Sequence, residues 1–459
     1  MRPRPLTAPG RPDGAPAVTP VPAARRPGAP AVTETPDAAS ATLGTMLRLH
    51  SPIRDYAWGS TTLLAALQGR EPSGAPEAEM WLGAHPAAPS EVETGTGERV
   101  TLDRLIAQGP ERHLGEAARF GRLPYLMKLL AAGRPLSIQA HPTLEQAREG
   151  FAAEEAAGTP LDAPERNYKD DNHKPEMVVA LTPFSALCGF RRPEESQLTF
   201  ERIAQVMTEY SDGNATEVAL AARHLAVLLA DGDVTGAFAE ILDPESIWSR
   251  GGTAELVEAL TGMQDLILHD DAIVTALEAA EHFPDDPGVL VTLLLNRVDL
   301  MPGQAVHLPA GNVHAYLHGL GVEIMAASDN VLRGGLTPKH VDVAELTRIV
   351  TFDPLPVPYT NPEPVGQGTV RYRPPFEEFA LTQLTAEGAD APAPAVLHGP
   401  AIAVGTKGTA EVCCGDERTT LAPGEAVFLS AAQTAAAPFE VRSGDGENTT
   451  VYVASMPAD

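Results

Sequence analysis

The sequence is poor in cysteine and in aromatic residues, and it has no long apolar run. Only three of its 459 residues are cysteine, and two of them, Cys413 and Cys414, are adjacent, a spacing that suits neither a disulfide framework nor a thiolate zinc site. No stretch approaches the ~20 apolar residues that a membrane-spanning helix needs, and no signal peptide opens the chain. These absences predict a soluble, cytoplasmic protein.

Basic residues are also scarce. The 33 Lys and Arg residues face 61 Asp and Glu residues, which gives a formal net charge of -28. Nucleic-acid binding rests on clustered basic side chains that neutralise phosphates, so this balance argues against a nucleic-acid partner. A hydrophobic content of 43% supports sizeable cores, and the length allows two or three domains. We therefore expect a small-molecule partner, bound in a local pocket, and favour a monomer.

Composition and periodicity divide the chain into five parts. Residues 1–45 are rich in Pro and Ala, without periodicity, and are predicted to be disordered. Residues 46–193 are predicted to be mainly β with short helices. Residues 194–285 show helical spacing and are predicted to form an inserted α-helical domain. Strand character returns in residues 286–364, and residues 365–459 form a further β segment.

The stretch Leu136–Pro142 is central to the functional reading. Its apolar and polar residues alternate, which predicts a strand with Gln139 and His141 on one face. An amide oxygen and an imidazole that project together from a stiff element can bind one metal ion. The alternative is an ordinary solvated strand face, which shows the same alternation.

Two further segments place charged groups at apolar strands. Glu176 opens an apolar strand after a polar turn, where a buried carboxylate needs a metal ion or another positive partner. His173 and Lys174 precede it in that turn and are equally explained as solvated charges. Lys128 interrupts the apolar strand predicted at 123–130, and the alternative there is a side chain that extends to solvent.

A spaced set of residues later in the chain is typical of the cupin fold. Gly303, Pro309, Gly311 and His314 match the second metal-binding motif of cupins, in which glycines shape two turns and the next strand directs the histidine inward. The alternative for His314 is a hydrogen-bonded core histidine. We also expect a strand at 289–296, before this motif.

The C-terminal part repeats the motif without its ligands. Residues 424–429 echo residues 303–308, but Ser430, Ala432 and Ala435 replace the proline, glycine and histidine. The prediction is a mainly β fold with two cupin or jelly-roll-like barrels and an inserted helical domain. The second barrel is expected to lack metal ligands.

Five blocks in order resemble the type I mannose-6-phosphate isomerase family, over essentially everything after Met46. The blocks are Ser137–Pro142, His173–Glu176, Leu187–Arg191, Pro309–Tyr316 and the pair Ala326–Asn330 with Arg333–Lys339. The resemblance implies one Zn²⁺ per chain, with Gln139, His141, Glu176 and His314 as ligands. Two nitrogen and two oxygen donors suit zinc.

The resemblance also implies interconversion of mannose 6-phosphate and fructose 6-phosphate through an enediol. It assigns Lys128, Ser137, Arg333 and Lys339 to the phosphate half of the pocket, with Arg333 also stabilising the intermediate.

The proton carrier stays open between Lys174, His173, Tyr316 and Glu323, of which we select Lys174. For Glu323 the alternative is an ion pair with Arg333 or Lys339.

Two other functions are compatible with a cupin fold. An oxygenase-type metal cupin is expected to show a histidine pair followed closely by a glutamate, whereas here Glu176 lies far beyond His141 and Gln139 replaces one histidine. A catalytically inactive sugar-binding cupin is disfavoured because all four ligands are retained together with Arg333 and Lys339.

Overall fold

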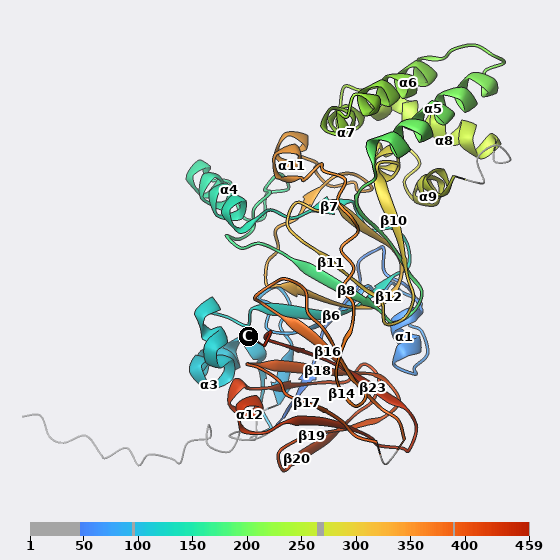
Figure 1. Cartoon of the computed structure of the whole chain (residues 1–459). Coiled ribbons are helices and arrows are strands. Elements are labelled where there is room, and N and C mark those ends of the chain that lie inside the picture. The colour runs from blue at the N-terminus through green and yellow to red at the C-terminus, as the bar shows by residue number, and fades with distance from the viewer. Residues whose placement is uncertain (1–45, 94–96, 264–269, 389–390, 459) are drawn as a thin grey trace, which may run out of the picture.

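The computed structural model describes residues 46–93, 97–263, 270–388 and 391–458. The predicted disordered tail, residues 1–45, lies outside the described residues. The fold is sheet-rich, as predicted, with antiparallel sheets in the lower two thirds of Figure 1 and a group of helices at the top. No helix among the described residues is long and apolar enough to cross a membrane.

The first sheet joins the two ends of the described chain. In spatial order it contains β14 (Glu363–Gly366), β15 (Thr369–Tyr372), β16 (Ala380–Ala386), β23 (Thr449–Ser455), β18 (Ala401–Lys407), β21 (Ala426–Leu429), β1 (Leu47–His50), β4 (Glu91–Glu93) and β5 (Arg99–Thr101). A second, four-stranded sheet contains β17 (Ala393–Ala395), β22 (Phe439–Ser443), β19 (Ala410–Cys414) and β20 (Glu417–Leu421). The strand β1 thus pairs with the C-terminal segment, with Leu47 opposite Phe428.

The third sheet carries the predicted site. Its main path is β10 (Leu295–Leu300), β9 (Phe184–Phe190), β12 (His314–Ala326), β6 (Tyr125–Ala132), β3 (Glu79–Leu82) and β2 (Ile53–Arg54). Four more strands branch from it: β7 (Gln139–Ala140), β8 (Glu176–Ala180), β11 (Ala305–Leu308) and β13 (Leu332–Arg333). The long strand β12 pairs with β6, β7, β8 and β9 and is the element around which the site is built.

A bulge in β12 decides which side chains face the pocket. The register against β9 shifts between Tyr316 and His318, so that two residues of β12 oppose one of β9. An inserted residue reverses the alternation of side chains. As a result Tyr316 and Glu323, which are seven positions apart, both line the same pocket.

The helices cover the ends of the sheets. They are α1 (Leu63–Leu67), α2 (Leu102–Gln108), α3 (Pro110–Leu114), α4 (Leu144–Ala157), α5 (Pro193–Tyr210), α6 (Glu217–Ala230), α7 (Val234–Leu242), α8 (Thr253–Gly262), α9 (Asp271–Ala280), α10 (Gly288–Thr292), α11 (Val343–Ile349) and α12 (Ala431–Ala436), with the short helical turns η2 (Gly115–Phe120) and η3 (Trp248–Gly252). Helices α5 to α9 gather at one end (Figure 1). Their core is continuous with the third sheet, because Phe238 and Trp248 belong to one apolar cluster with Ile138 and Ala315.

Two predicted strands differ from the structure. Helix α10 covers the first half of the strand expected at 289–296, and strand begins only at Leu295. Val289, Leu290 and Val291 are all buried, and a short, largely apolar run does not distinguish a buried helix from a buried strand. The strand expected at 136–142 is reduced to Gln139–Ala140, and the flanking amides of Leu136 and Ile138 donate to the carbonyls of Tyr316 in β12 and of Gly335 in a loop.

The two turns around residues 303–311 and 424–430 show how the halves differ. Gly303 and Gly424 both have positive φ, at 86° and 84°, and each leads into a four-residue strand. In the first half a second positive-φ turn at Gly311 then directs the chain into His314. In the second half Ser430 instead caps helix α12. Helix α12 therefore stands at the position of the second motif where the first motif has its histidine.

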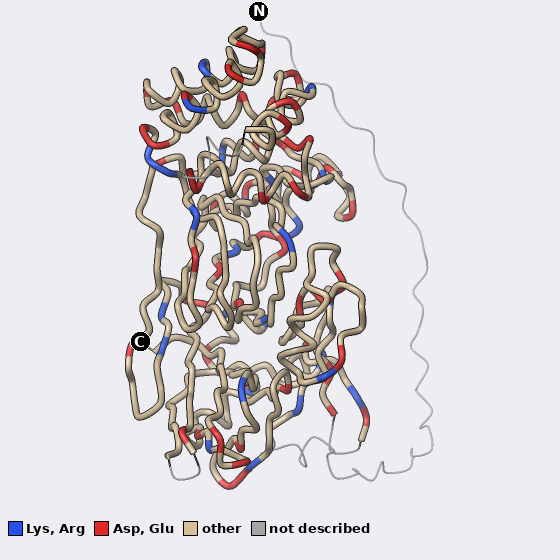
Figure 2. The backbone as a smooth tube through the Cα atoms, turned by 90° about the vertical axis from the view of Figure 1, so that its right-hand side faces the viewer, with Lys and Arg blue, Asp and Glu red and all other residues tan. Residues whose placement is uncertain are grey.

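Acidic side chains are distributed over the whole length of the molecule (Figure 2). The ion pairs at the surface are mostly between residues close in sequence, such as Arg192 with Glu195. Exposed pairs of this kind contribute little to stability. The excess of acidic residues therefore belongs mainly to the surface. The pocket described in the next subsection contains a local group of basic residues.

Candidate metal centre

Three strongly polar side chains converge in the interior of the third sheet. His141 follows β7, Glu176 begins β8 and His314 begins β12. The Nε2 atom of His141 lies 3.4 Å from Oε1 of Glu176, and Nε2 of His314 lies 3.3 Å from Oε2 of the same carboxylate. One donor atom from each residue lies within 4.8 Å of the other two. The side chains are at most 1% exposed. The sequence nominated these three residues from three separate segments, and the fold brings them together.

The two imidazoles are oriented by their second nitrogens. Nδ1 of His141 donates to the carbonyl oxygen of Asn330 at 2.7 Å, and Nδ1 of His314 donates to that of Asn312 at 3.1 Å. A ring that donates through Nδ1 keeps the lone pair of Nε2 free, which is the usual arrangement of a metal-bound histidine. Both lone pairs then face the carboxylate of Glu176.

The inward donor atoms have no hydrogen-bond partner. Nε2 of His141, Nε2 of His314 and Oε2 of Glu176 are all buried and unsatisfied within the described structure. Leaving a buried polar atom without a partner costs about 1–3 kcal/mol. Burial lowers the pKa of His141 to about 4, which keeps the ring neutral. Although burial alone would raise the pKa of Glu176, Lys174 and His141 hold it well below its ordinary value, so the carboxylate is charged. The neutral ring of His141, a second imidazole and a carboxylate fit a zinc ion.

Gln139 lies in the same row of the sheet. It is directly opposite His314 on one side and Arg333 on the other. Residues directly opposite one another on antiparallel strands project from the same face. The amide of Gln139 is therefore on the face of His314, and Arg333 follows next in the row.

A pocket of about 470 Å³ opens beside the three donors. Its lining includes Gln139, Glu176, Lys128, Lys174, Ser137, Arg333, Lys339, Tyr316 and Glu323. A larger cavity of about 1150 Å³ lies against η2 and the C-terminal segment, and none of the predicted site residues lines it. The chemistry of the donors makes the smaller pocket the candidate site.

Lys128 is held inside the sheet rather than extending to solvent. It lies opposite Glu323 of β12 and Trp81 of β3. Its Nζ atom is 2.8 Å from Oε2 of Glu323 and 3.2 Å from Oε1 of Glu79. Although burial alone would lower the pKa of Lys128, the two carboxylates raise it, so the amine stays protonated. The expected ion pair of Glu323 with Arg333 or Lys339 is wrong, because the partner is Lys128.

The two residues before Pro175 diverge. Nζ of Lys174 lies 3.0 Å from Oε1 of Glu176 and lines the pocket. His173 faces the other way, with Nε2 2.6 Å from Oε1 of Glu378 in the C-terminal part. Among the open candidates for proton transfer, Lys174, Tyr316 and Glu323 line the pocket and His173 does not.

Comparison with known proteins gives the family. A family model for the catalytic domain of type I phosphomannose isomerase matches residues 46–193. The chain is 39% identical over 417 residues to the mannose-6-phosphate isomerase of Salmonella typhimurium, covering 89% of this chain and 99% of the relative. The Escherichia coli enzyme of the same name is 39% identical over 411 residues, with the same coverage. The chain belongs to the type I phosphomannose isomerase family.

Solved structures of this family share the fold. A variant of phosphomannose isomerase from Salmonella typhimurium superposes with a TM-score of 0.78 at 34% identity, covering 90% of this chain and 100% of that chain. A zinc-bound mannose 6-phosphate isomerase superposes with a TM-score of 0.77 at 35% identity over the same shares. The resemblance seen in five short blocks therefore extends over the described chain.

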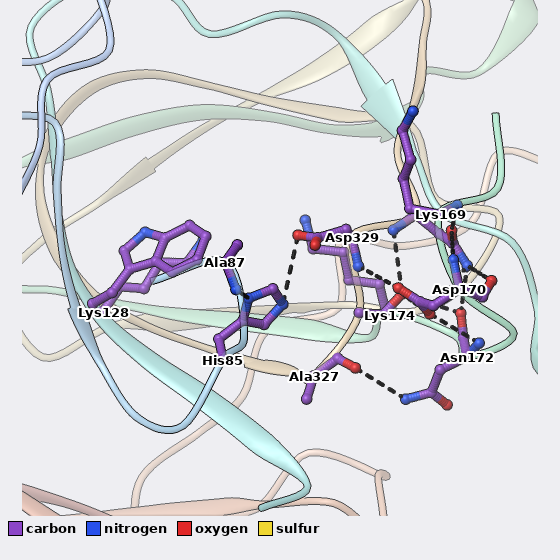
Figure 3. A network of polar contacts seen from close by, with 12 residues as sticks. His85, Ala87, Lys128, Lys169, Asp170, Asn172, Lys174, Ala327 and Asp329 are labelled. Atoms are coloured by element: carbon purple, nitrogen blue, oxygen red, sulfur yellow. Dashed lines mark hydrogen bonds and ion pairs between the residues drawn. The ribbon is translucent and has the colours of Figure 1, made fainter. Parts of the chain in front are cut away.

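A network of hydrogen bonds braces the centre in this phosphomannose isomerase family member (Figure 3). It joins residues 169–172, just before Lys174, to residues 327–330, just before Arg333, and we refer to it as the clasp. The Asp170 carboxylate accepts from Ser328 Oγ and from the Asp329 amide, both at 2.8 Å. The side-chain amide of Asn330 donates to the backbone carbonyl of Asp170 at 2.7 Å and to that of Asn172 at 2.8 Å.

The clasp reaches the metal donors through Asn330. This residue is fully buried, and its carbonyl accepts the hydrogen bond of His141. Its side-chain oxygen accepts from the Lys169 amide at 2.7 Å and the Asp170 amide at 3.2 Å. The sequence analysis used residues 326–330 in the family resemblance but assigned Asp170 and Asn330 no role. Their polar side chains in two segments distant in the chain were the available signal.

Proposed function

We propose that this chain interconverts mannose 6-phosphate and fructose 6-phosphate as a zinc-dependent aldose-ketose isomerase. The observation that carries the proposal is the group of three buried donor atoms without partners, beside a pocket that is lined by Glu176, Lys174, Arg333 and Lys339. Membership of the phosphomannose isomerase family and the names of the relatives support the same substrate pair.

Gln139, His141, Glu176 and His314 would hold one zinc ion. The zinc-bound relative supports the identity of the metal, and the neutral His141 ring and charged Glu176 carboxylate suit it. When bound, zinc supplies a fixed positive charge that stabilises negative charge developing on the sugar oxygens. None of the four ligands is a thiolate, so the set does not resemble a closed structural site.

The remaining residues position the sugar and move its proton. Isomerisation transfers a proton between neighbouring carbon atoms through an enediol. Lys174, the proposed proton carrier, has its amine at the pocket wall beside Glu176. Arg333, in the row of Gln139 and His314, offers a guanidinium fork to the negative oxygens of the intermediate.

The phosphate group would bind at the basic end of the pocket. Ser137 and Lys339 line that end together with Arg333. Lys128 was also expected to contact the phosphate. Because it is already paired with Glu79 and Glu323, its proposed part is to keep that wall of the pocket positively charged and rigid.

The proposed organisation follows the cupin reading. Residues 46–193 and 286–364 form a catalytic cupin-like unit, residues 194–285 a helical insertion and residues 365–459 a second cupin-like unit without metal ligands. The shared apolar cluster of Leu47, Leu381 and Phe428 supports close attachment of the two β units. We further propose that the protein acts in the cytoplasm and as a monomer.

A coupled enzymatic assay tests the function. Purified protein is given mannose 6-phosphate, fructose 6-phosphate and glucose 6-phosphate separately, and the products are identified. The proposal predicts that mannose 6-phosphate and fructose 6-phosphate interconvert, at rates well above that for glucose 6-phosphate. Absence of conversion in both directions, with zinc bound, would reject it.

A further inference from the structure

The charged groups of the pocket fall into two sets. At the metal end every acidic side chain has a partner: Glu79 and Glu323 contact Lys128, Glu176 contacts Lys174, and Asp329 lies 3.5 Å from His85. Three further cations line the pocket, Arg134, Arg333 and Lys339, and none of them forms an ion pair with a carboxylate of the described residues. Cations gathered without carboxylates form a site for an anion.

The positive charges of Arg333 and Lys339 affect each other's environment in the pocket. Burial and then the charge of Arg333 lower the pKa of Lys339, so these two cations lie near enough to repel each other. Burial also lowers the pKa of Arg333. Such repulsion is relieved when an anion binds between the groups.

Arg134 lines the pocket from a fixed backbone. It follows β6, and the amides of Gly133 and Arg134 donate to the carbonyl of Trp58 at 3.0 and 3.3 Å. Ser137 follows three positions later and lines the same pocket. Gly133 packs directly on the backbone of Ser60. The backbone that carries the Arg134 side chain is therefore fixed against the segment 58–60.

The guanidinium of Arg134 contains a buried nitrogen that lacks a hydrogen-bond acceptor within the described structure. Its Nε atom is buried and makes no hydrogen bond within the described structure. A buried donor of a charged group without an acceptor is costly. Arg134 also lines the pocket, so an oxygen-rich anion such as a phosphate bound there can accept from the terminal nitrogens of its guanidinium.

We infer that Arg134 is a further phosphate-binding residue, which holds the phosphate of the sugar phosphate together with Arg333 and Lys339. This inference rests on the proposed function for the identity of the sugar. The anion site itself follows from the three cations without carboxylate partners. Since the phosphate does not react, its contact with Arg134 is the same in the ground state and the transition state. Loss of Arg134 should therefore weaken binding and leave the rate of the bound complex nearly unchanged.

Two variants and a control test the inference. Arg134→Gln removes the charge, Arg134→Lys keeps the charge without the fork, and Arg122→Gln removes an exposed arginine outside the pocket. For Arg134→Gln we expect KM for mannose 6-phosphate to rise about 10- to 100-fold, the range for a lost hydrogen bond to a charged group, with kcat within about threefold of the parent. Arg134→Lys should be intermediate and Arg122→Gln unchanged. Zinc content should be that of the parent in all three.

A binding measurement separates this inference from the proposed function. Trp58 and Trp81 line the pocket, so tryptophan fluorescence can follow titration with inorganic phosphate without turnover. Arg134→Gln should weaken phosphate binding by the same factor as it raises KM. If the parent binds phosphate but does not isomerise the sugar, the proposed function is wrong and the anion site stands. If Arg134→Gln binds phosphate and mannose 6-phosphate as tightly as the parent, or loses kcat instead, Arg134 is not a phosphate ligand.

Discussion

Replacing Asn330 by alanine tests whether the clasp positions the metal centre. The change removes the side-chain hydrogen bonds of Asn330, of which four, to the Lys169 and Asp170 amides and to the Asp170 and Asn172 carbonyls, are 2.7 to 3.2 Å long. At ~1 kcal/mol for each bond, the buried network loses roughly 4 kcal/mol. The carbonyl that orients His141 remains in the variant, but the side chain that fixes its position does not.

Part of this lost free energy should appear as weaker zinc binding. Changes in groups that orient a metal ligand typically lower metal affinity about 10- to 100-fold, which corresponds to about 1.4–2.7 kcal/mol. This share is smaller than the total loss from the clasp, so the two magnitudes are consistent. Competition with a chromophoric chelator measures the zinc affinity of the parent and the variant at equilibrium.

A matched change in the same segment serves as the control. Asn167→Ala removes the hydrogen bond from the Asn167 amide to Asp342, at 2.9 Å, which lies outside the clasp. It should leave zinc affinity unchanged. An Asn330→Ala protein that folds and binds zinc as tightly as the parent would refute the reasoning, because the orientation of His141 would then not depend on the clasp.

Four further substitutions test separate parts of the site. Gln139→Ala and His141→Ala should each lower zinc content and isomerase activity together, and a His141 variant with full zinc and full activity would show that the ligand assignment is wrong. Arg333→Ala should keep zinc and lower kcat about 100- to 1000-fold, as loss of one donor to a developing negative charge does, and an unchanged kcat would remove its catalytic part. Lys128→Met should cost about 3–5 kcal/mol of stability, measured by unfolding, because Glu79 and Glu323 then face each other without a cation. Adding Glu323→Gln to that variant should restore part of the loss, and an equal loss in both would contradict the pairing.

The candidate metal donors could be predicted because each is marked by its local sequence. Alternation identified Gln139 and His141, the junction of a polar turn with an apolar strand identified Glu176, and spaced glycines identified His314. Periodicity and spacing are local properties, and the positive φ of Gly303 and Gly311 agrees with the turns they predicted. That the donors meet in space depends on pairing between β12, β7 and β8, which the family resemblance supplied.

The sequence predictions failed where a residue's environment is determined by segments that are distant in the chain. The ion pairs of Lys128 could not be predicted, because the carboxylates that hold it lie on β3 and β12. Glu323 faces the pocket only because of the bulge after Tyr316, which shifts its alternation. The run 289–296 is apolar except for Thr292 and Asn296, so its pattern did not reveal that helix α10 covers its first half. The roles of Asp170 and Asn330 also required contacts between segments about 160 residues apart.

Titration of metal-free protein with zinc tests the central claim most directly. Bound zinc and isomerase activity are measured on the same samples as zinc is added. The account predicts that both rise together and saturate at one zinc ion per chain, and that a chelator reverses both. Full activity toward mannose 6-phosphate in protein without zinc would contradict the account.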